Sequence, residues 1–286
     1  MTYKILVIGA SGMLGSSIFR FLSQFSSYQV WGSVRSSDSS LLFPKAMRSM
    51  IVSGVDVESS DSLIGLFSSV KPTLVINCVG LVKQLSVSKN ALAAIPINSL
   101  LPHRLASMCE MVNARLIHFS TDCVFSGYRG MYTEGDIPDA QDMYGRSKLL
   151  GEVDYPHAIT LRTSIIGHEL SGTRSLVGWF LSQQGAVKGY RRAIFSGLPT
   201  VEIARLIHNH VIPHPEISGL YHVSADPINK FDLLEIVAKV YQKDIEILAD
   251  NHLIIDRSLD STRFRNATGF QPKSWPELVQ AMHNFH

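Results

Sequence analysis

The sequence predicts an α/β protein with a doubly wound parallel sheet and a smaller C-terminal region. Short apolar runs rich in β-forming residues alternate with segments whose apolar residues recur at helical spacing, from the N-terminus to about residue 163. A glycine-rich turn joins the first of these runs to the first helical segment. Because parallel strands need crossover connections, the alternation indicates βαβ units and a parallel sheet.

The elements follow in order along the chain. The expected strands, each a short apolar run, are Tyr3–Ile8, Gln29–Val34, Met47–Val52, Thr73–Asn77, Ala114–Phe119 and Ala158–Leu161. The expected helices between them are Met13–Phe25, Ser60–Val70, Pro96–Met111 and Met143–Val153. Beyond Arg162 the pattern loosens, and the expected helices are Ser175–Gln184, Thr200–His210, Phe231–Tyr241 and Trp275–Asn284. One later strand, Gly219–Val223, is expected to return to the sheet.

Composition narrows the class of protein. The chain has 286 residues, 45% of them apolar, and a formal net charge of +2 without a basic cluster, so we expect a globular protein that does not bind nucleic acid. Its three cysteines lack C-x-x-C spacing, and no metal site is indicated. We find no leader and no apolar run of roughly 20 residues, so we expect a cytoplasmic protein that does not enter the membrane. A homodimer is compatible with the sequence.

The turn Gly9–Gly15 predicts a dinucleotide site of the Rossmann type. Glycine permits positive φ and close approach of the backbone to a pyrophosphate, and the N-terminus of a helix attracts anions. The residues expected to contact the cofactor here are Gly9, Ser11, Gly12, Met13, Leu14 and Gly15. The spacing is looser than G-x-G-x-x-G, and a glycine-rich turn without a ligand is the alternative.

Tyr144 and Lys148 lie four residues apart in a predicted helix and therefore share one face. An ammonium group beside a phenol stabilises the phenolate, which lets the tyrosine exchange a proton near neutral pH. The same lysine is placed to hold the ribose of a nicotinamide nucleotide. Taken alone, the pair is more often a surface tyrosine near a solvated lysine, but the upstream glycine turn favours catalysis.

Ser120 and Thr121 directly follow the strand Ala114–Phe119. The carboxyl ends of strands face the ligand crevice in open α/β sheets, so Thr121 is expected to hydrogen-bond a substrate oxygen. The alternative is that either hydroxyl only caps the turn.

Arg35, after the second strand, favours NADPH over NADH because its guanidinium suits a 2′-phosphate. The alternative for Arg35 is a solvated loop position. Asp56 and Val57 follow the third strand, where an acceptor for the adenine edge would lie.

The chain resembles the extended short-chain dehydrogenase/reductases, and among them the dTDP-4-dehydrorhamnose reductase (RmlD-like) family. The resemblance covers essentially the whole chain and is carried by the three glycines and by the segments Ser120–Gly127, Tyr144–Glu152, Arg162–Gly167 and Gly219–Ser224. It implies an NAD(P)-binding domain at residues 1–163 and a substrate-binding region at residues 164–286. It also implies reduction of a 4-keto group on a nucleotide-linked deoxysugar with NADPH, or with NADH, for cell-surface polysaccharide synthesis.

By position, the resemblance assigns catalysis to Thr121, Tyr144 and Lys148, and it adds cofactor contacts at Cys78, Val79, Gly80 and Ser120. Candidate substrate contacts are Lys83, Asn98, Thr121 and Arg191, the last because guanidinium suits a diphosphate. Two departures lie near the expected pocket: Cys123 replaces the family's tyrosine, and Cys78–Gln84 replaces an Ala-rich segment. They leave a UDP-2-acetamido-4-keto sugar open as the substrate. A non-catalytic, dinucleotide-binding regulatory subunit is the alternative of another class.

Overall fold

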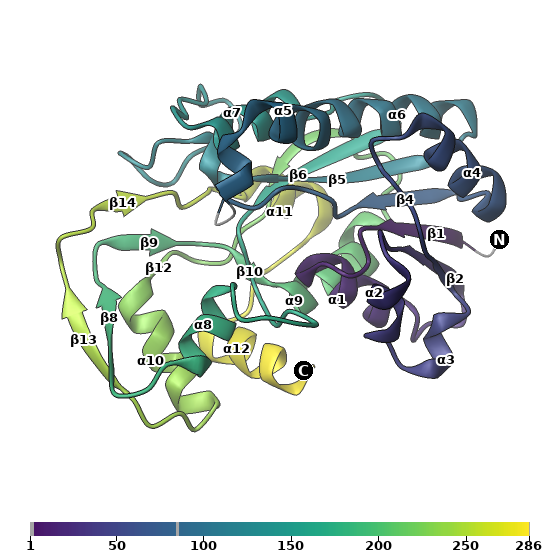
Figure 1. The fold of residues 1–286 in the computed structure, drawn as a ribbon. Coiled ribbons are helices and arrows are strands. Elements are labelled where there is room, and N and C mark those ends of the chain that lie inside the picture. The colour runs from purple at the N-terminus through teal and green to yellow at the C-terminus, as the bar shows by residue number, and fades with distance from the viewer. Residues whose placement is uncertain (1–2, 84–85, 286) are drawn as a thin grey trace. The chain divides into compact units, whose positions relative to one another are not determined.

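Seven strands form the central sheet of the protein, in a computed structural model that describes residues 3–83 and 86–285. The strands are β1 (Tyr3–Ile8), β2 (Tyr28–Ser33), β3 (Ile51–Val52), β4 (Leu74–Asn77), β5 (Arg115–Thr121), β6 (Ala158–Thr163) and β11 (Gly219–His222). Their spatial order is β11-β6-β5-β4-β1-β2-β3 (Figure 1). This is the Rossmann-type order, so the predicted fold class is confirmed, and the late strand lies at the edge next to β6.

The centre of the sheet is apolar on both faces. Residues Ile5–Ile8 of β1 are fully buried, and β1 pairs in parallel with both β2 and β4. The pairs β2–β3 and β4–β5 are also parallel. Strands covered by helices on both faces need a continuous apolar run rather than an alternating one, which explains the sequence of β1.

The chain divides into two compact units. Unit 1 contains residues 1–120, 142–161 and 215–220, and unit 2 contains residues 121–141, 162–214 and 221–286. The helical segments of unit 1 are α1 (Met13–Leu22), α2 (Ser37–Leu41), α3 (Lys45–Arg48), α4 (Ser60–Val70), η1 (Ser86–Lys89), α5 (Ala91–Ala94), η2 (Ile95–Leu100), α6 (Leu101–Met111) and α7 (Met143–Leu150).

The core of unit 1 lies between one layer of helices and the sheet. In Figure 1, α4, α5, α6 and α7 lie along one face of the sheet, and α1 lies against the other. Side chains such as Leu63 and Phe67 of α4 and Leu105 of α6 pack with Leu6 of β1 and Leu116 of β5 in one buried cluster. The predicted helix Ser60–Val70 is confirmed with its bounds, because Ser59 caps its first turn by accepting from the Ser62 N–H.

Several predicted elements of unit 1 are corrected. The predicted strand Met47–Val52 is a strand only at Ile51–Val52, because the preceding residues form α3 behind Pro44. The predicted helix Pro96–Met111 is two elements, a π-helical turn in η2 and the α-helix α6. The predicted helix Met13–Phe25 ends at Leu22.

The predicted helix Met143–Val153 also ends early, at Leu150. A Cβ built on the following Gly151 would lie 1.9 Å from the backbone oxygen of Asn98. The end of α7 therefore packs closely on η2 at a position where only glycine fits. Gln84, the last residue of the altered Cys78–Gln84 segment, lies outside the described residues.

Unit 2 contains three small sheets and six further helical segments. The sheets are β10 (Leu198–Pro199) with β7 (Ile165–Ile166), β12 (Ile228–Asn229) with β9 (Ala193–Phe195) and β14 (Ile255–Asp256), and β13 (Glu246–Asp250) with β8 (Ala186–Tyr190). The helical segments are α8 (Leu176–Ser182), α9 (Thr200–Leu206), η4 (Ile207–Val211), α10 (Lys230–Val240), α11 (Thr262–Thr268) and α12 (Trp275–Asn284), and a short turn, η3 (Asp122–Val124), follows β5. The four predicted helices are present here, whereas α11 and the short strands were not predicted.

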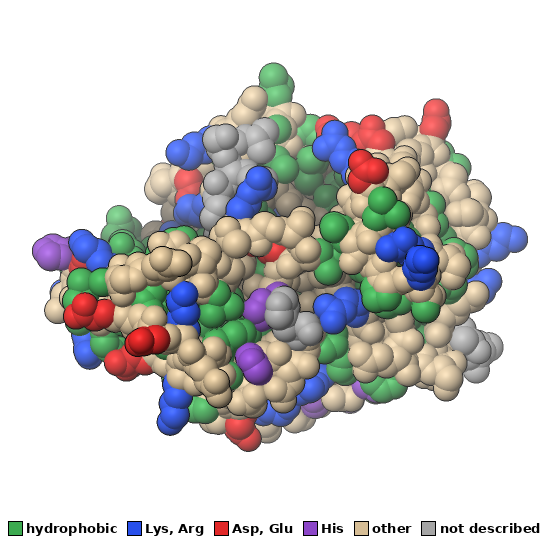
Figure 2. All heavy atoms as spheres, turned by 60° about the horizontal axis from the view of Figure 1, so that its bottom comes forward, with side chains coloured by type: hydrophobic (Ala, Val, Ile, Leu, Met, Phe, Trp, Pro, Cys, Tyr) green, Lys and Arg blue, Asp and Glu red, His purple; other side chains and the backbone are tan. Residues whose placement is uncertain are grey.

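No helix in the described part of the chain is long and apolar enough to cross a membrane. On the face drawn in Figure 2, basic and acidic side chains are interspersed among hydrophobic and other side chains.

A buried histidine links three segments of unit 2. His222 is fully buried, its Nδ1 lies 2.9 Å from the Tyr132 backbone oxygen, and its Nε2 lies 3.2 Å from Arg162 Nη1. An arginine only donates, so Nε2 accepts and Nδ1 carries the proton of a neutral ring. Burial, and then the nearby Arg162 charge, lower the pKa of His222 to about 4.

We expect this histidine to make the protein less stable in mild acid. The unfolded ring binds a proton below about pH 6.5 and the folded ring only near pH 4, so the unfolded state takes up more protons between these values. Between pH 7 and 5, His222 should lower the free energy of unfolding by about 2 kcal/mol. Urea denaturation at both pH values measures this change. His222→Gln should have a smaller pH dependence; an unchanged dependence would assign the effect to other groups.

Candidate active site

The glycine turn between β1 and α1 has a geometry that only glycine permits at two positions. Gly9 has a φ of +81°, and a Cβ built on it would lie 2.7 Å from Val79 Cγ2. A Cβ on Gly15 would lie 2.2 Å from the backbone oxygen of Gly9. The first turn of α1 therefore packs directly on the end of β1, the close contact that brings a helix N-terminus up to a ligand.

The N-terminus of α1 fits an anionic group. Gly12 is its N-cap and supplies no side-chain acceptor, and the first turn contains no acidic residue. Other helices of unit 1, such as α4 and α7, have side-chain caps from Ser59 and Asp142. Of the predicted contacts around this turn, Gly12 is exposed, Ser11 and Met13 are half-buried, and Leu14 is buried. These residues fit the pyrophosphate of a dinucleotide, since backbone N–H groups and the helix dipole both favour negative charge there.

Lys148 is buried in unit 1, although lysine is normally a surface residue. Only 6% of it is exposed, and its Nζ donates to the Phe119 backbone oxygen at 2.7 Å. Burial lowers the pKa of Lys148 to about 8, partly offset by the charge of Glu152. Among the described residues, the Lys148 ammonium donates to one backbone oxygen. Burying a charge with so little compensation is costly in the apoprotein, and such buried charges are typical of functional sites.

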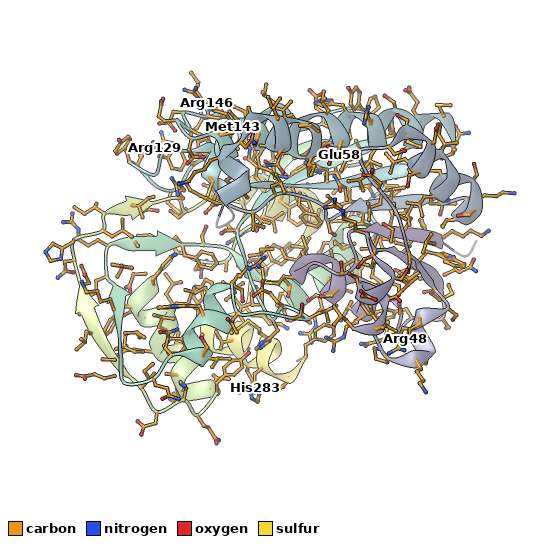
Figure 3. The ribbon with its side chains drawn as sticks, viewed as in Figure 1. Arg48, Glu58, Arg129, Met143, Arg146 and His283 are labelled. Atoms are coloured by element: carbon orange, nitrogen blue, oxygen red, sulfur yellow. The ribbon has the colours of Figure 1, made fainter. Side chains whose placement is uncertain are left out.

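Tyr144 lies one turn before Lys148 on α7 and is half-buried. The helix begins at Met143, labelled in Figure 3, because Asp142 caps it by accepting from the Gly145 N–H at 2.8 Å. Arg146, also labelled there, is exposed. The helix thus carries Tyr144 and Lys148 at the spacing that places them on one face.

Asn98 joins this helix to the segment after β4. Its Oδ1 accepts from the Leu81 N–H at 2.9 Å, and its Nδ2 donates to Ser147 Oγ at 3.1 Å. A Cβ built on Gly80 would lie 3.5 Å from Asn98 Oδ1 and 3.8 Å from Lys148 Nζ. The structure therefore brings Gly80, Asn98 and Lys148 together, and the amide of Asn98, predicted to contact substrate, is bonded within the chain.

The cofactor residues predicted after β4 form one short segment beside the glycine turn. Cys78 donates its N–H to the Ile8 oxygen at 3.0 Å, and Val79 packs against Gly9. Cys78 and Val79 are half-buried and Gly80 is exposed.

The hydroxyls of Ser120 and Thr121 both have partners within the protein. Ser120 Oγ donates to Glu152 Oε1 at 2.6 Å. Thr121 Oγ1 donates to Asp122 Oδ1 and accepts from the Cys123 N–H, both at 3.1 Å, so it caps the turn η3. Burial raises the pKa of Asp122. The capping role considered for Thr121 is thus present, and a hydroxyl oxygen with two lone pairs retains one for another donor.

The residues predicted around the adenine end lie beyond β2 and β3. Arg35 follows β2 and is exposed. Asp56 is also exposed, and its carboxylate accepts from the Glu58 N–H at 3.0 Å in a local turn, whereas Val57 is half-buried against the core.

The two basic residues predicted to contact substrate both have partners. Lys83 forms an ion pair with Asp142 at 2.6 Å, with both side chains exposed. Arg191, in unit 2, stacks over the Phe231 ring at 4.0 Å. Such stacking leaves the edge of a guanidinium able to donate.

Sequence reasoning missed three polar side chains that organise unit 1. Asn77, His118 and Ser147 are buried. The Asn77–His118 hydrogen bond links β4 to β5, and the bond from Asn98 to Ser147 links η2 to α7. A polar residue inside an otherwise apolar strand was the available signal for Asn77 and His118.

In the described residues, no group of three or more His, Cys, Asp or Glu is arranged to hold a metal ion.

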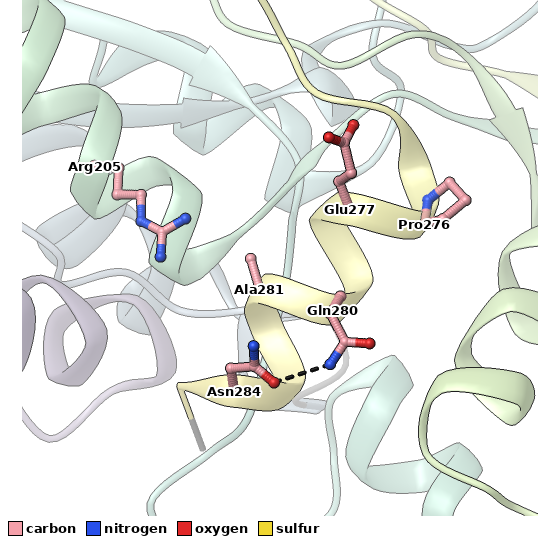
Figure 4. A pocket seen from close by; sticks show the side chains of 6 residues that line it. All are labelled: Arg205, Pro276, Glu277, Gln280, Ala281 and Asn284. Carbon is pink, nitrogen blue, oxygen red and sulfur yellow. Dashed lines mark hydrogen bonds between the residues drawn. The ribbon is translucent and has the colours of Figure 1, made fainter.

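A pocket of about 460 Å³ in unit 2 is lined by Arg205, Pro276, Glu277, Gln280, Ala281 and Asn284 (Figure 4). None of these six residues was predicted as a site residue, and Arg205 is paired with Glu202.

Comparison with known proteins gives matches over more than half of the chain or nearly all of it. The model of the RmlD substrate binding domain family matches residues 3–284. A dTDP-4-dehydrorhamnose reductase of Aggregatibacter actinomycetemcomitans is 25% identical over 97% of each chain. A probable low-salt glycan biosynthesis reductase, Agl14, of Haloferax volcanii is 34% identical over 60% of this chain, a match that spans 57% of that protein.

A similar solved structure is the dTDP-4-dehydrorhamnose reductase of Bacillus anthracis in complex with NADP. It has a TM-score of 0.79 and 19% identity, with 99% of each chain covered. This likeness concerns the fold. The family and sequence matches favour neither the UDP-sugar alternative nor the regulatory-subunit alternative.

Proposed function

Because the chain belongs to the RmlD substrate binding domain family, we propose that it reduces the 4-keto group of a nucleotide-linked deoxysugar with NADPH. It is an oxidoreductase like its dTDP-4-dehydrorhamnose reductase relatives. We assign it to the synthesis of nucleotide sugars for surface polysaccharides. The C-terminal residues 164–286 supply most of the substrate-binding region in this proposal, and residues 1–163 bind the cofactor.

One observation carries the proposal: a buried lysine lies beside the segment that packs on the glycine turn. Val79 contacts Gly9, and the next residue, Gly80, lies close to Lys148. A dinucleotide whose pyrophosphate lies at α1 would extend its nicotinamide half along this segment toward α7. The proposal thus accounts for a lysine with a lowered pKa and for a helix N-terminus without an acidic cap.

The chemistry assigned to the residues is a proton transfer coupled to hydride delivery. NADPH supplies the hydride to the carbonyl carbon when bound. Tyr144 donates its phenolic proton to the carbonyl oxygen as negative charge develops there. Lys148 stabilises the resulting phenolate and holds the nicotinamide ribose. Thr121 donates to the same substrate oxygen and exchanges its bond to Asp122 for that contact.

We assign the nucleotide-sugar diphosphate to Arg191, with Lys83 as a further contact. The assignment to NADPH is supported by the exposed Arg35 after β2 and by the NADP-bound relative of the same fold. Cys78, Cys109 and Cys123 form no disulfide among the described residues, which supports a reducing compartment, and we place the protein in the cytoplasm.

Arg35→Asp should shift the cofactor preference toward NADH. The change removes the partner of the 2′-phosphate and adds an acceptor for a 2′-hydroxyl, so the ratio of NADPH to NADH affinity should fall by roughly 10–100-fold. Fluorescence titration with both cofactors measures the ratio. Lys45→Asp, the same charge change at another exposed position, is the control. Equal shifts in the two variants would remove Arg35 from the site.

The experiment that tests the function is turnover with a defined panel. The protein is incubated with NADPH and either dTDP- or UDP-linked 4-keto sugars, and loss of nicotinamide absorbance is followed. We expect oxidation of NADPH with the dTDP-linked 4-keto-deoxysugar, with the product identified by mass spectrometry. Turnover with UDP-linked 2-acetamido-4-keto sugars alone would reassign the substrate, and no oxidation with either class would overturn the reductase assignment.

A further inference from the structure

Two asparagine side chains hold the segment Cys78–Leu81 in unit 1. Asn77 Oδ1 accepts from the Val79 N–H at 3.1 Å, and Asn98 Oδ1 accepts from the Leu81 N–H at 2.9 Å. Each asparagine is fully buried or nearly so. Since Val79 packs on Gly9 and Gly80 lies near Lys148, these two acceptors fix the segment that links the glycine turn to α7.

The amide of Asn77 is oriented by His118 on the neighbouring strand β5. Asn77 Nδ2 lies 3.1 Å from His118 Nδ1. An amide nitrogen can only donate, so Nδ1 must accept, and the proton of the neutral ring is on Nε2. This arrangement turns the amide oxygen of Asn77 toward the Val79 N–H.

The arrangement leaves one donor unsatisfied. His118 is 1% exposed, and its Nε2 has no hydrogen-bond partner among the described residues. A buried donor without a partner costs about 1–3 kcal/mol, which a leucine of similar size would avoid. Stability alone therefore does not account for a histidine here.

Protonation would disrupt the contact. With a proton on Nδ1, the ring and Asn77 Nδ2 would both present donors, and the amide would have to turn its oxygen away from Val79. Burial keeps the pKa of His118 well below its usual value, and the charges of Lys148 and of His103 act in the same direction. The ring is therefore neutral at physiological pH.

We propose that His118 is a positioning residue: by accepting from Asn77 it keeps the Asn77 oxygen on Val79 and so holds Cys78–Leu81 in the shape that receives the cofactor. The last part rests on the proposed function, because the segment is assigned to the cofactor there. The hydrogen bond itself is independent of that assignment.

A matched pair of variants tests the role. In His118→Asn, Oδ1 is separated from Cβ by the same number of bonds as Nδ1, so an acceptor is kept; His118→Leu has almost the shape of asparagine but no acceptor. We expect His118→Leu to weaken NADPH binding about tenfold, with a smaller effect on kcat, and His118→Asn to stay within about threefold of the wild type. Equal losses in the two variants would overturn the proposal.

Hydrogen exchange of single amides separates the positioning role from general loss of stability. In His118→Leu we expect the Val79 N–H to exchange about tenfold faster, whereas the Leu81 N–H, held by Asn98, keeps its protection. Equal acceleration of both amides would show a merely structural role. This readout needs no cofactor, so it remains decisive if the wild-type protein binds no NADPH, a result that would count against the proposed function alone.

A further variant covers the case in which His118→Leu does not fold. Asn77→Asp keeps one oxygen for Val79 and offers the other to a protonated Nδ1, so the Val79 N–H should stay protected. The pKa of His118 should rise, as seen in an NMR titration of its ring. Loss of Val79 protection in this variant, or an unchanged pKa, would contradict the proposed orientation.

Discussion

Tyr144→Phe should lower kcat by about 10²–10⁴-fold while NADPH affinity stays nearly unchanged. The variant keeps the aromatic ring and its packing but removes the group assigned to protonate the substrate oxygen. Thr121 is too weak an acid to replace it at neutral pH, and its hydroxyl is bonded to Asp122. Steady-state kinetics and fluorescence titration with NADPH measure the two quantities.

Tyr128→Phe is the matched control because Tyr128 is 95% exposed. It should leave both quantities unchanged. Near-normal turnover in Tyr144→Phe would exclude Tyr144 as the acid, and a parallel loss of NADPH affinity would point to a binding role instead.

Lys148→Met should lower kcat and cofactor affinity together, and it should stabilise the apoprotein. Lysine in the unfolded chain holds its proton up to about pH 10.5 and the folded Lys148 only up to about pH 8. The unfolded state therefore binds more protons between these values, so wild-type stability rises with pH through that range. Below pH 8 the full penalty, about 3 kcal/mol, is present.

Methionine removes the buried charge and leaves the Phe119 oxygen without the 2.7 Å bond from Nζ, which offsets part of the gain. We expect a net increase of about 1–2 kcal/mol in the free energy of unfolding at pH 7. Urea denaturation at pH 7 and 9.5 should also show that the variant lacks the wild-type rise. A less stable variant at pH 7 would mean that Lys148 is satisfied in the apoprotein, which would weaken the argument for a strained catalytic lysine.

The sheet of this protein was predictable because its signals are local. The run Tyr3–Ile8 is apolar throughout, and the glycine turn after it marks the change to a helix. The start of β3 was predicted at Met47 instead of Ile51 because the residues before Ile51 are apolar enough for a strand. In the structure, Pro44 precedes a short helix, α3, that takes up Met47. Strands of unit 2 such as β7 and β12 contain only two residues, too few for an alternating pattern to be recognised.

The part of the candidate site that could be predicted consists of residues whose arrangement depends only on their separation within one helix. Tyr144 and Lys148 share a helix face by their four-residue separation, whatever the rest of the fold does. Asn77, His118 and Ser147 were missed because their partners are distant in the sequence: His118 lies 41 residues from Asn77, and Ser147 lies 49 residues from Asn98. Only the register of β4 and β5 and the packing of η2 on α7 bring them together.

The π-helical turn η2 (Ile95–Leu100) determines in which directions the side chains before it point relative to those of α6, because α5, η2 and α6 form one continuous helical stretch. Each residue of an α-helix advances by about 100°. A single deletion at Ser99 or Leu100 that converted this π turn to a regular one would therefore rotate the residues before the deletion, Asn98 among them, relative to α6. If α6 kept its packing on the sheet, Asn98 would swing off the Leu81 N–H. If Asn98 kept its bonds, Leu105 and Cys109 would leave the core. The extra residue of the π turn thus lets Asn98 reach Leu81 while Leu105 and Cys109 pack in the core, which a regular α-helix would not allow. We therefore expect relatives of this chain to tolerate substitutions in this turn far better than a change in its length.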